Sequence, residues 1–215
     1  MTYQQAFDAL MRVGAKAALL DFFREDSCIN STRVLLEVFR TLGLEAAPFA
    51  VRTRIFSKAF VDRAAREGRF PSTQEETHEW TSQPGVWSVG IGYFHAGMPP
   101  DAWLGHLVLR AGPHLLDATI SQASRPEKGI ELPQMLVVEN VPEDFWRGLL
   151  NITTVGADGC VVQYEPQPRY NGYMTTPGWS FRGGIEAAAH RQIMGRIDFL
   201  DHTNGTGRLA ILGGK

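Results

Sequence analysis

Cysteine is scarce in this chain, and its N-terminus has little of what a secretion signal or a membrane anchor needs. The 215 residues include two cysteines, Cys28 and Cys160, which lie far apart in the sequence. Cysteines so few and so widely separated are typical of a protein from a reducing compartment. The first 23 residues carry neither a basic start nor a long apolar run, so we expect neither a signal peptide nor a membrane span. These absences predict a cytoplasmic protein.

The chain also lacks an excess of charge of one sign. It has 21 basic and 23 acidic residues, which give a formal net charge of −2. A basic excess is the electrostatic feature that attracts polyanions. We therefore expect neither nucleic acid nor a membrane surface among the partners.

A recognisable metal-binding motif is missing as well. The run E-E-x-H-E at 75–79 has a spacing that matches no zinc motif. It lies in the polar, turn-rich stretch 69–84, which reads as a long, solvated loop. We expect neither a metal ion nor an organic cofactor.

Repeats and low-complexity linkers are absent too, and the composition is that of an ordinary globular protein. Hydrophobic residues make up 44% of the chain and charged residues 20%. A chain of this length can bury one sizeable core, so we expect a single domain over 1–215.

Apolar periodicity predicts helices early in the chain and a series of strands later. Helices are expected over 3–24, 27–42, 58–68, 142–150 and 184–201, and strands over 48–56, 86–94, 103–110, 114–120, 134–140 and 159–165. The stretches 151–158 and 166–184 are expected to be irregular. Consecutive strands after N-terminal helices indicate an α+β fold, in which the helices pack on an antiparallel sheet.

Cys28 occupies a position that suits a nucleophile. The apolar stripe of the helix over 27–42 begins beside it, and Asp26 or Ser27 is expected to cap the helix. In the first turn of a helix, the partial positive charge of the unpaired N–H groups favours thiolate over thiol. Those N–H groups can also bind an oxyanion. Cys160 has no such setting and is expected to be packed in the interior.

A histidine and an aspartate provide candidate partners for the thiol. The strands over 103–110 and 114–120 form a predicted hairpin, and a loop of two residues (111 and 112) or four (110–113) would place His106 directly opposite Asp117. Their Cβ atoms would then be about 5 Å apart on one face of the sheet, whereas a three-residue loop would break this register. In this arrangement the carboxylate accepts the Nδ1–H of the imidazole, and Nε2 faces the thiol as a general base.

These segments resemble the transglutaminase-like and papain-like cysteine enzymes. In that superfamily a cysteine opens a helix, a Gly-hydrophobic pair closes it, and small residues lead into a strand, as in 28–51 here (CINSTRVLLEVFRTLGLEAAPFAV). The segment 105–119 is similar to the family's histidine strand, which is followed by an aspartate strand ending in D-x-T. The resemblance implies a papain-like or transglutaminase-like core, with Cys28 as nucleophile, His106 as base and Asp117 as the orienting acid.

The expected function is therefore that of a cysteine-dependent amide hydrolase or acyltransferase that acts through a thioester. Its substrate would be a peptide, a protein or a small amide or thioester, and Trp103 and Trp87 are candidates to line the acyl-binding cleft. One alternative is an acyltransferase similar to the arylamine N-acetyltransferases, although the Arg-Cys dipeptide of those enzymes is absent.

Two other classes remain as alternatives. The first is a binding domain that retains the fold with a silent site, although such a domain would have no chemical need for all three side chains. The second is a metal-dependent hydrolase that uses His106, His114 and Asp117. It is disfavoured because these side chains do not converge in the expected register.

Overall fold

The structure is a computed structural model, and it describes residues 1–24, 27–93, 103, 105–156, 159–180 and 184–203. Its α-helices are α1 (Tyr3–Arg12), α2 (Ala15–Leu20), α3 (Cys28–Thr41), α4 (Lys58–Glu67), α5 (Gln74–Thr81), α6 (Glu143–Trp146), α7 (Pro177–Ser180) and α8 (Gly184–Thr203). The strands are β1 (Ala46–Phe56), β2 (Ser88–Ile91), β3 (His106–Ala111), β4 (His114–Asp117), β5 (Leu136–Val138), β6 (Ile152–Val155) and β7 (Val161–Pro166). Short 3₁₀ helices are η1 (Ile120–Ala123), η2 (Pro126–Lys128) and η3 (Gly172–Thr175).

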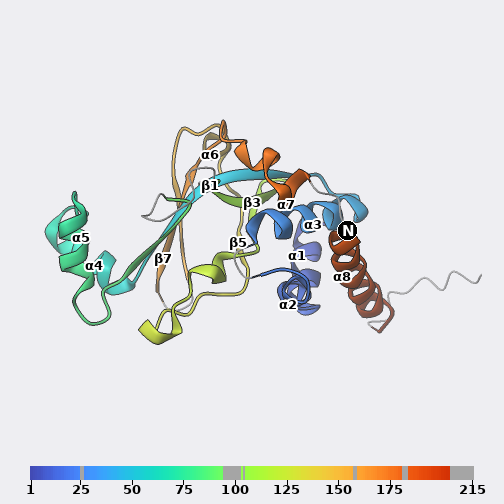
Figure 1. Cartoon of the computed structure of the whole chain (residues 1–215), viewed down its shortest axis with the longest axis horizontal. Coiled ribbons are helices and arrows are strands. Elements are labelled where there is room, and N and C mark those ends of the chain that lie inside the picture. Colours follow the sequence, from blue (N-terminus) through green and yellow to red (C-terminus); the bar gives the residue numbers. More distant parts are fainter. Residues whose placement is uncertain (25–26, 94–102, 104, 157–158, 181–183, 204–215) are drawn as a thin grey trace, which may run out of the picture.

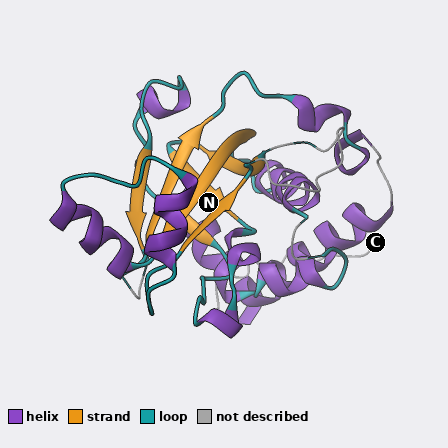
Figure 2. Ribbon diagram, turned by 60° about the vertical axis from the view of Figure 1, so that its left-hand side comes forward, coloured by secondary structure: helices purple, strands orange, loops and turns teal. Residues whose placement is uncertain are grey.

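The strands form an antiparallel sheet that curls into a nearly closed, barrel-like shape (Figures 1 and 2). The order along the sheet is β5-β4-β3-β1-β7-β6, and β2 pairs with β1 beyond the end of β3. The long strand β1 connects the two halves, because residues 46–51 pair with β3 and residues 51–56 pair with β7. The expectation of helices combined with an antiparallel sheet is confirmed.

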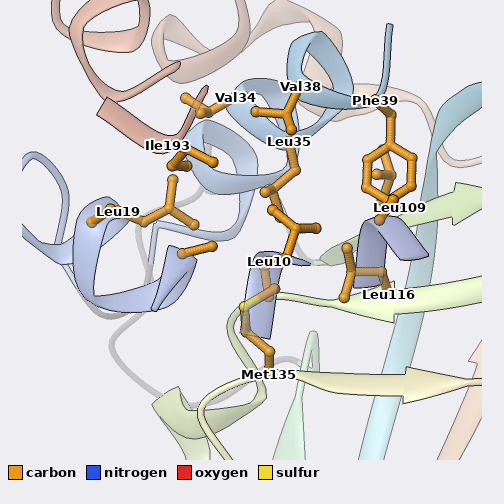
Figure 3. Close-up of a cluster of buried hydrophobic side chains, with 14 of the residues drawn as sticks. Leu10, Leu19, Val34, Leu35, Val38, Phe39, Leu109, Leu116, Met135 and Ile193 are labelled. Carbon is orange, nitrogen blue, oxygen red and sulfur yellow. The ribbon is translucent and has the colours of Figure 1, made fainter. Parts of the chain in front are cut away.

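Helices α1, α2, α3 and α8 cover one face of the sheet, and their apolar residues meet those of β3 and β4 (Figure 3). Leu10, Leu35, Leu109 and Ile193 are among the fully buried members of this cluster. Burial of a leucine or isoleucine side chain stabilises a fold by about 1.5–3 kcal/mol. This cluster is what fixes α3, and with it Cys28, against the sheet.

The other face of the sheet encloses a second apolar cluster. Most of its buried members come from the strands, from η1 and from α6, and Val141 and Cys160 lie just outside these elements: Val51, Ile55, Val108, Leu115, Ile120, Ala123, Val141, Phe145, Trp146, Ile152, Cys160, Val162 and Tyr164. Cys160 is 2% exposed, so it is packed in the interior. The sheet is therefore apolar on both faces.

The single helix expected over 3–24 is wrong in one respect, because the chain breaks it near its middle. Helix α1 ends at Arg12 and α2 begins at Ala15. Gly14 lies between them with a φ of 62°, a left-handed conformation that glycine adopts at little cost.

Among the helices of the described residues, none combines the length and the apolarity that a bilayer crossing requires.

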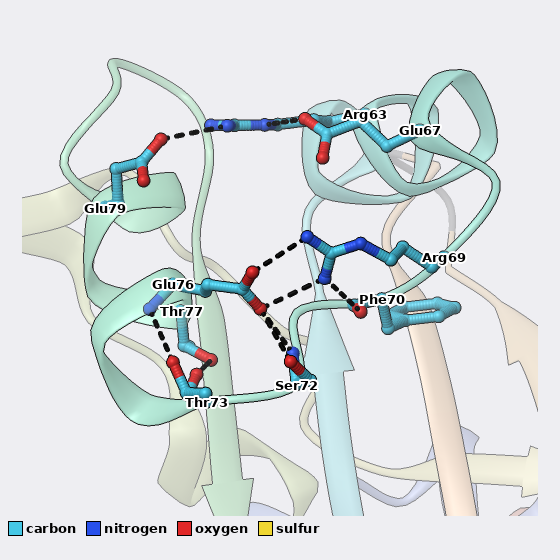
Figure 4. A network of polar contacts seen from close by, with 9 residues as sticks. All are labelled: Arg63, Glu67, Arg69, Phe70, Ser72, Thr73, Glu76, Thr77 and Glu79. Atoms are coloured by element: carbon cyan, nitrogen blue, oxygen red, sulfur yellow. Dashed lines mark hydrogen bonds and ion pairs between the residues drawn. The ribbon is translucent and has the colours of Figure 1, made fainter.

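The long loop expected over 69–84 is also wrong, because it contains α5. The Oγ1 atom of Thr73 accepts a hydrogen bond from the Glu76 N–H at 3.1 Å and so caps this helix. Arg69 pairs with the Glu76 carboxylate, which also accepts hydrogen bonds from Ser72 (Figure 4). Arg69 first, and then Ser72, lower the pKa of Glu76 to about 2. The carboxylate of Glu76 thus links the beginning of α5 to Arg69 and Ser72.

The hairpin of α4 and α5 lies apart from the other helices, at the far end of β1 (Figure 1). It has an apolar cluster of its own, to which Phe60 and Trp80 contribute. The guanidinium of Arg63 lies 4.4 Å from the ring centroid of Trp80 and pairs with Glu67 and Glu79. The helical hairpin over 58–81 is therefore held by its own apolar cluster and ion pairs, which are separate from the two larger apolar clusters of the sheet.

Two stretches that were expected to be irregular contain regular structure. Residues 152–155 form β6, which pairs with β7 from Ile152↔Tyr164 to Val155↔Val161. This run of β-branched residues (ITTV) has the composition of a strand, so the loop expected over 151–158 is wrong there. The stretch 166–184 includes η3 and α7.

Candidate active site

Cys28 is the first residue of α3, as expected, and its side chain is 8% exposed. Ser27 occupies the capping position, but its side chain makes no capping hydrogen bond. The N–H groups of the first helical turn have no partner within the helix. The thiol therefore lies where the helix dipole favours an anion. Asp26, the other expected cap, is outside the described residues.

A buried hydrogen bond joins the helix of Cys28 to the strand of His106. Thr32 Oγ1 donates to the carbonyl oxygen of Leu107 at 3.0 Å. The side chains of Cys28 and Leu107 belong to one small apolar cluster, together with those of Ala50 and Tyr173. The N-terminus of α3 is thereby held against the beginning of β3.

His106 and Asp117 contact one another in the interior, but not in the expected register. Both side chains are completely buried, and Nε2 of His106 lies 2.7 Å from Oδ2 of Asp117. Strands β3 and β4 pair Leu109 with Leu116 and Ala111 with His114, a shift of two residues from the register that would place His106 opposite Asp117. A shift by two leaves both residues on the same face, where diagonal neighbours remain within reach of each other.

The physical reason for the shift is the turn. The loop has two residues, but they are Gly112 and Pro113 and not 111 and 112. Gly112 has a φ of 58°, which is the conformation that a type II′ hairpin turn requires at its first central residue.

The imidazole is oriented in the opposite sense from the expected one. Nε2 binds the Asp117 carboxylate, and Nδ1 lies 3.2 Å from the side-chain nitrogen of Gln122. Because an ionised carboxylate is an acceptor, Nε2 carries the proton. Nδ1 is then the acceptor that faces the Gln122 amide, and Cys28 lies near enough to His106 to contribute to its raised pKa.

The Asp117 carboxylate accepts further hydrogen bonds. The backbone N–H of Thr119 donates to Oδ1 at 3.0 Å, which places the first and last residues of the D-x-T element in contact. The hydroxyl of Tyr164 donates to Oδ2 at 3.0 Å, the same oxygen that holds His106. Three donors thus stabilise a carboxylate that has no contact with solvent.

This network shifts the pKa values of its members. Complete burial alone would lower the pKa of His106, but the charge and hydrogen bond of Asp117, with a smaller contribution from Cys28, raise it from 6.5 to about 10. Burial first, and then the charge of Asp117, raise the pKa of Tyr164 well above its ordinary value of 10. The imidazole is thus a strong base, and the phenol stays protonated as a donor.

Aromatic rings gather around Cys28. Trp103, one of the two predicted substrate residues, packs against the cluster of Cys28 and stacks on Tyr170 with centroids 5.8 Å apart. The ring of Tyr173 makes an edge contact with that of Trp103. It makes another with Trp179, and the centroids of that pair are 4.9 Å apart. Trp103 thus packs against the small apolar cluster that contains Cys28.

Trp87, the other predicted substrate residue, lies elsewhere. It precedes β2 and packs against the second apolar cluster, the one that contains Tyr164 and Cys160. The structure does not bring it into the cluster of Cys28. His114 also lies apart: it begins β4, and its ring contacts Tyr3 and Phe7.

The metal alternative has no geometric support within the part of the chain that is described. There, no group of three or more histidine, cysteine, aspartate or glutamate side chains has an arrangement that could hold a metal ion. His106 and Asp117 instead bind each other.

Two residues of the site, Gln122 and Tyr164, were not predicted from the sequence. Gln122 lies on η1, five residues after Asp117, and the position of that turn depends on the path of the chain beyond β4. Tyr164 lies on β7, and it reaches Asp117 only because the sheet curls.

Comparison with known protein families, with curated proteins and with solved structures found no match.

Proposed function

We propose that this protein is a cysteine-dependent amide hydrolase or acyltransferase that forms a thioester on Cys28. The observation that carries the proposal is the buried pair of His106 and Asp117 near Cys28, the first residue of α3, which contributes to the raised pKa of His106. A structural histidine has no need of a thiol at a helix N-terminus on one side and a buried carboxylate on the other. This is the arrangement that nucleophilic catalysis by cysteine requires.

The reaction follows from the positions of the groups. The Cys28 sulfur attacks the carbonyl carbon of the substrate, and the N–H groups of the first turn of α3 stabilise the oxygen that becomes negative. The imidazolium of His106 gives its proton to the leaving nitrogen as the C–N bond breaks. Neutral His106 then takes a proton from water or an acceptor amine, which attacks the thioester and releases Cys28.

Trp103 is the residue that we assign to the acyl group. Its indole Nε1 is buried and has no hydrogen-bond partner among the described residues. A carbonyl oxygen of a bound substrate would satisfy this donor. Trp87, which lies outside the cluster of Cys28, has less support as a substrate residue.

We further infer a papain-like or transglutaminase-like core in a single domain, located in the cytoplasm. The support for this core is the contact between the N-terminus of α3 and the first residues of β3 in an antiparallel sheet. Neither of the two cysteines forms a disulfide, in accord with a reducing compartment. The proposed partner is a peptide, a protein or a small amide or thioester.

Intact-mass measurement after exposure to a panel of acyl donors tests the proposed function. The panel contains peptide amides, aryl esters and acyl thioesters, and it is applied to the unmodified protein and to Cys28→Ala. We expect a mass increase equal to the acyl group in the unmodified protein alone, and the donor that gives it identifies the substrate class. Acylation that persists in Cys28→Ala would refute the assignment. A protein that never acylates, although Cys28 reacts with iodoacetamide, would favour a binding domain with a silent site.

A further inference from the structure

Tyr164 makes a contact that the order of the strands does not suggest. It lies on β7, whereas Asp117 lies on β4, and strands β3 and β1 lie between them in the sheet. The side chain of Tyr164 is fully buried, and its hydroxyl reaches Asp117 Oδ2 at 3.0 Å. The curl of the sheet therefore brings a phenol from the opposite strand to the candidate catalytic carboxylate.

Two donors share one oxygen of Asp117. His106 Nε2 lies 2.7 Å and the Tyr164 hydroxyl 3.0 Å from Oδ2. A hydrogen bond to a fully charged carboxylate is stronger than one to a carboxylate whose charge is already neutralised. The Tyr164 hydrogen bond is accordingly stronger when His106 is neutral than when it is an imidazolium. A donor of this kind stabilises the neutral imidazole relative to the charged form.

We propose that Tyr164 is a positioning residue that limits how tightly Asp117 holds the proton of the His106 imidazolium. The proposal rests on the proposed function for its meaning in catalysis. His106 must release a proton to the leaving nitrogen after it has stabilised the thiolate of Cys28. An aspartate with no second donor would hold the imidazolium more strongly and slow that release.

Few other titratable groups face His106 among the described residues. Cys28 approaches from α3, Asp117 from β4 and Tyr164 from β7, while Gln122 on η1 contributes a neutral amide. Cys28 contributes to the raised pKa of His106. The test therefore replaces Cys28, so that the effect of Tyr164 on the imidazole is measured without the thiol.

The experiment is an NMR titration of the His106 imidazole in full-length Cys28→Ala protein, with and without Tyr164→Phe. Phenylalanine keeps the ring, which packs in the second apolar cluster, and removes only the hydroxyl. We expect the His106 midpoint to rise by about 0.5–1 pH unit, which corresponds to part of one charge-assisted hydrogen bond. A midpoint that stays the same or falls would overturn the proposal, because a tyrosine that only fills space has no influence on the imidazole proton.

Tyr93→Phe is the matched control. Like Tyr164, Tyr93 donates its hydroxyl to a carboxylate. Its acceptor is Oε2 of Glu165, at 3.2 Å, and not Asp117. Its removal should leave the His106 midpoint unchanged. A shift equal to that of Tyr164→Phe would overturn the proposal by showing a general effect of hydroxyl loss.

Replacement of Tyr164 by 3-fluorotyrosine provides a second measurement that does not depend on the folding of the phenylalanine variant. Fluorine beside the hydroxyl makes it a stronger donor, so the His106 midpoint should fall. A rise or no change would contradict the proposal. Because all these proteins lack the thiol, the result is readable even if Cys28 proves unreactive, and a failure of the proposed function is thereby distinguished from a failure of this one.

Discussion

Thr32 and Leu107 join the two elements that carry the thiol and the imidazole. The Thr32 hydroxyl donates to the Leu107 carbonyl at 3.0 Å, four residues after Cys28 on α3 and one residue after His106 on β3. Both partners are buried. The relative position of the helix N-terminus and the strand therefore depends on a polar contact in addition to apolar packing.

Thr32→Val keeps the shape of the side chain and removes its donor, which leaves the buried Leu107 carbonyl without this partner. We expect the free energy of unfolding to decrease by about 1–3 kcal/mol and the alkylation of Cys28 to slow. Urea denaturation and iodoacetamide kinetics measure the two effects. Thr41→Val is the matched control on the same helix, since the Thr41 hydroxyl donates to the Glu37 carbonyl and lies 3.0 Å from His190 Nε2, both at exposed positions. The control should cost less than about 0.5 kcal/mol; equal losses in the two variants would contradict a special role for Thr32.

Asp117→Asn tests the orienting acid. The substitution keeps the size of the side chain but removes the charge that raises the pKa of His106. Acyl transfer by the folded protein should fall by about 10²- to 10⁴-fold, as in serine triads, and stability should also fall because the buried pair with His106 is broken. Asp144→Asn is a suitable control, because that carboxylate is exposed and pairs only with Arg147 among the contacts described. Unchanged acyl transfer in folded Asp117→Asn would contradict the role of Asp117 as the orienting acid.

The raised pKa of His106 also predicts how stability depends on pH. Between pH 6.5 and about 10 the folded protein keeps a proton that the unfolded chain releases. The stabilisation is therefore complete below pH 6.5 and is lost as the pH rises through about 10. Urea midpoints measured across this range should decline with pH, and the decline should be shallower in Asp117→Asn. Equal slopes in the two proteins would argue against the raised pKa.

Gly105→Ala tests the packing of Trp103 beside the site. A Cβ atom at position 105 would overlap the indole ring of Trp103, so the ring must move. Overpacking of this kind costs about 1–3 kcal/mol, and we expect altered tryptophan fluorescence and slower acyl transfer. Gly195→Ala on α8 is the control, since a Cβ atom there meets no atom within 4 Å. It should stabilise the protein by about 0.5–1 kcal/mol. Unchanged fluorescence and rate in Gly105→Ala would contradict the assignment of Trp103.

The sequence was most informative where short-range patterns determine the structure. The apolar stripe predicts the helix of Cys28 over 27–42, and α3 spans Cys28–Thr41. Alternation along the strands also places His106 and Asp117 on one face, and this survives an error of two residues in the register. The turn at Gly112 could have been assigned from its chemistry, because a glycine followed by proline fits a type II′ turn.

The remaining features depend on tertiary structure that local patterns do not contain. Tyr164 alternates with its neighbours in β7, which indicates which face it occupies but not that a curled sheet will carry it to Asp117. The ring nitrogen that binds Asp117 depends on the same geometry. Helix α5 is different, because the capping pair Thr73 and Glu76 was present in the sequence as a signal for it.

The most direct test of the paired thiol and imidazole is the rate of Cys28 alkylation by iodoacetamide at neutral pH, followed by peptide mass spectrometry in the unmodified protein and in His106→Ala. Buried Cys160 serves as the internal reference and should react slowly in both. We expect Cys28 to react much faster than Cys160 at neutral pH in the unmodified protein. The rate for Cys28 should fall in His106→Ala, because the cation that pairs with the thiolate is gone. An unchanged rate would show that Cys28 and His106 do not form a functional pair.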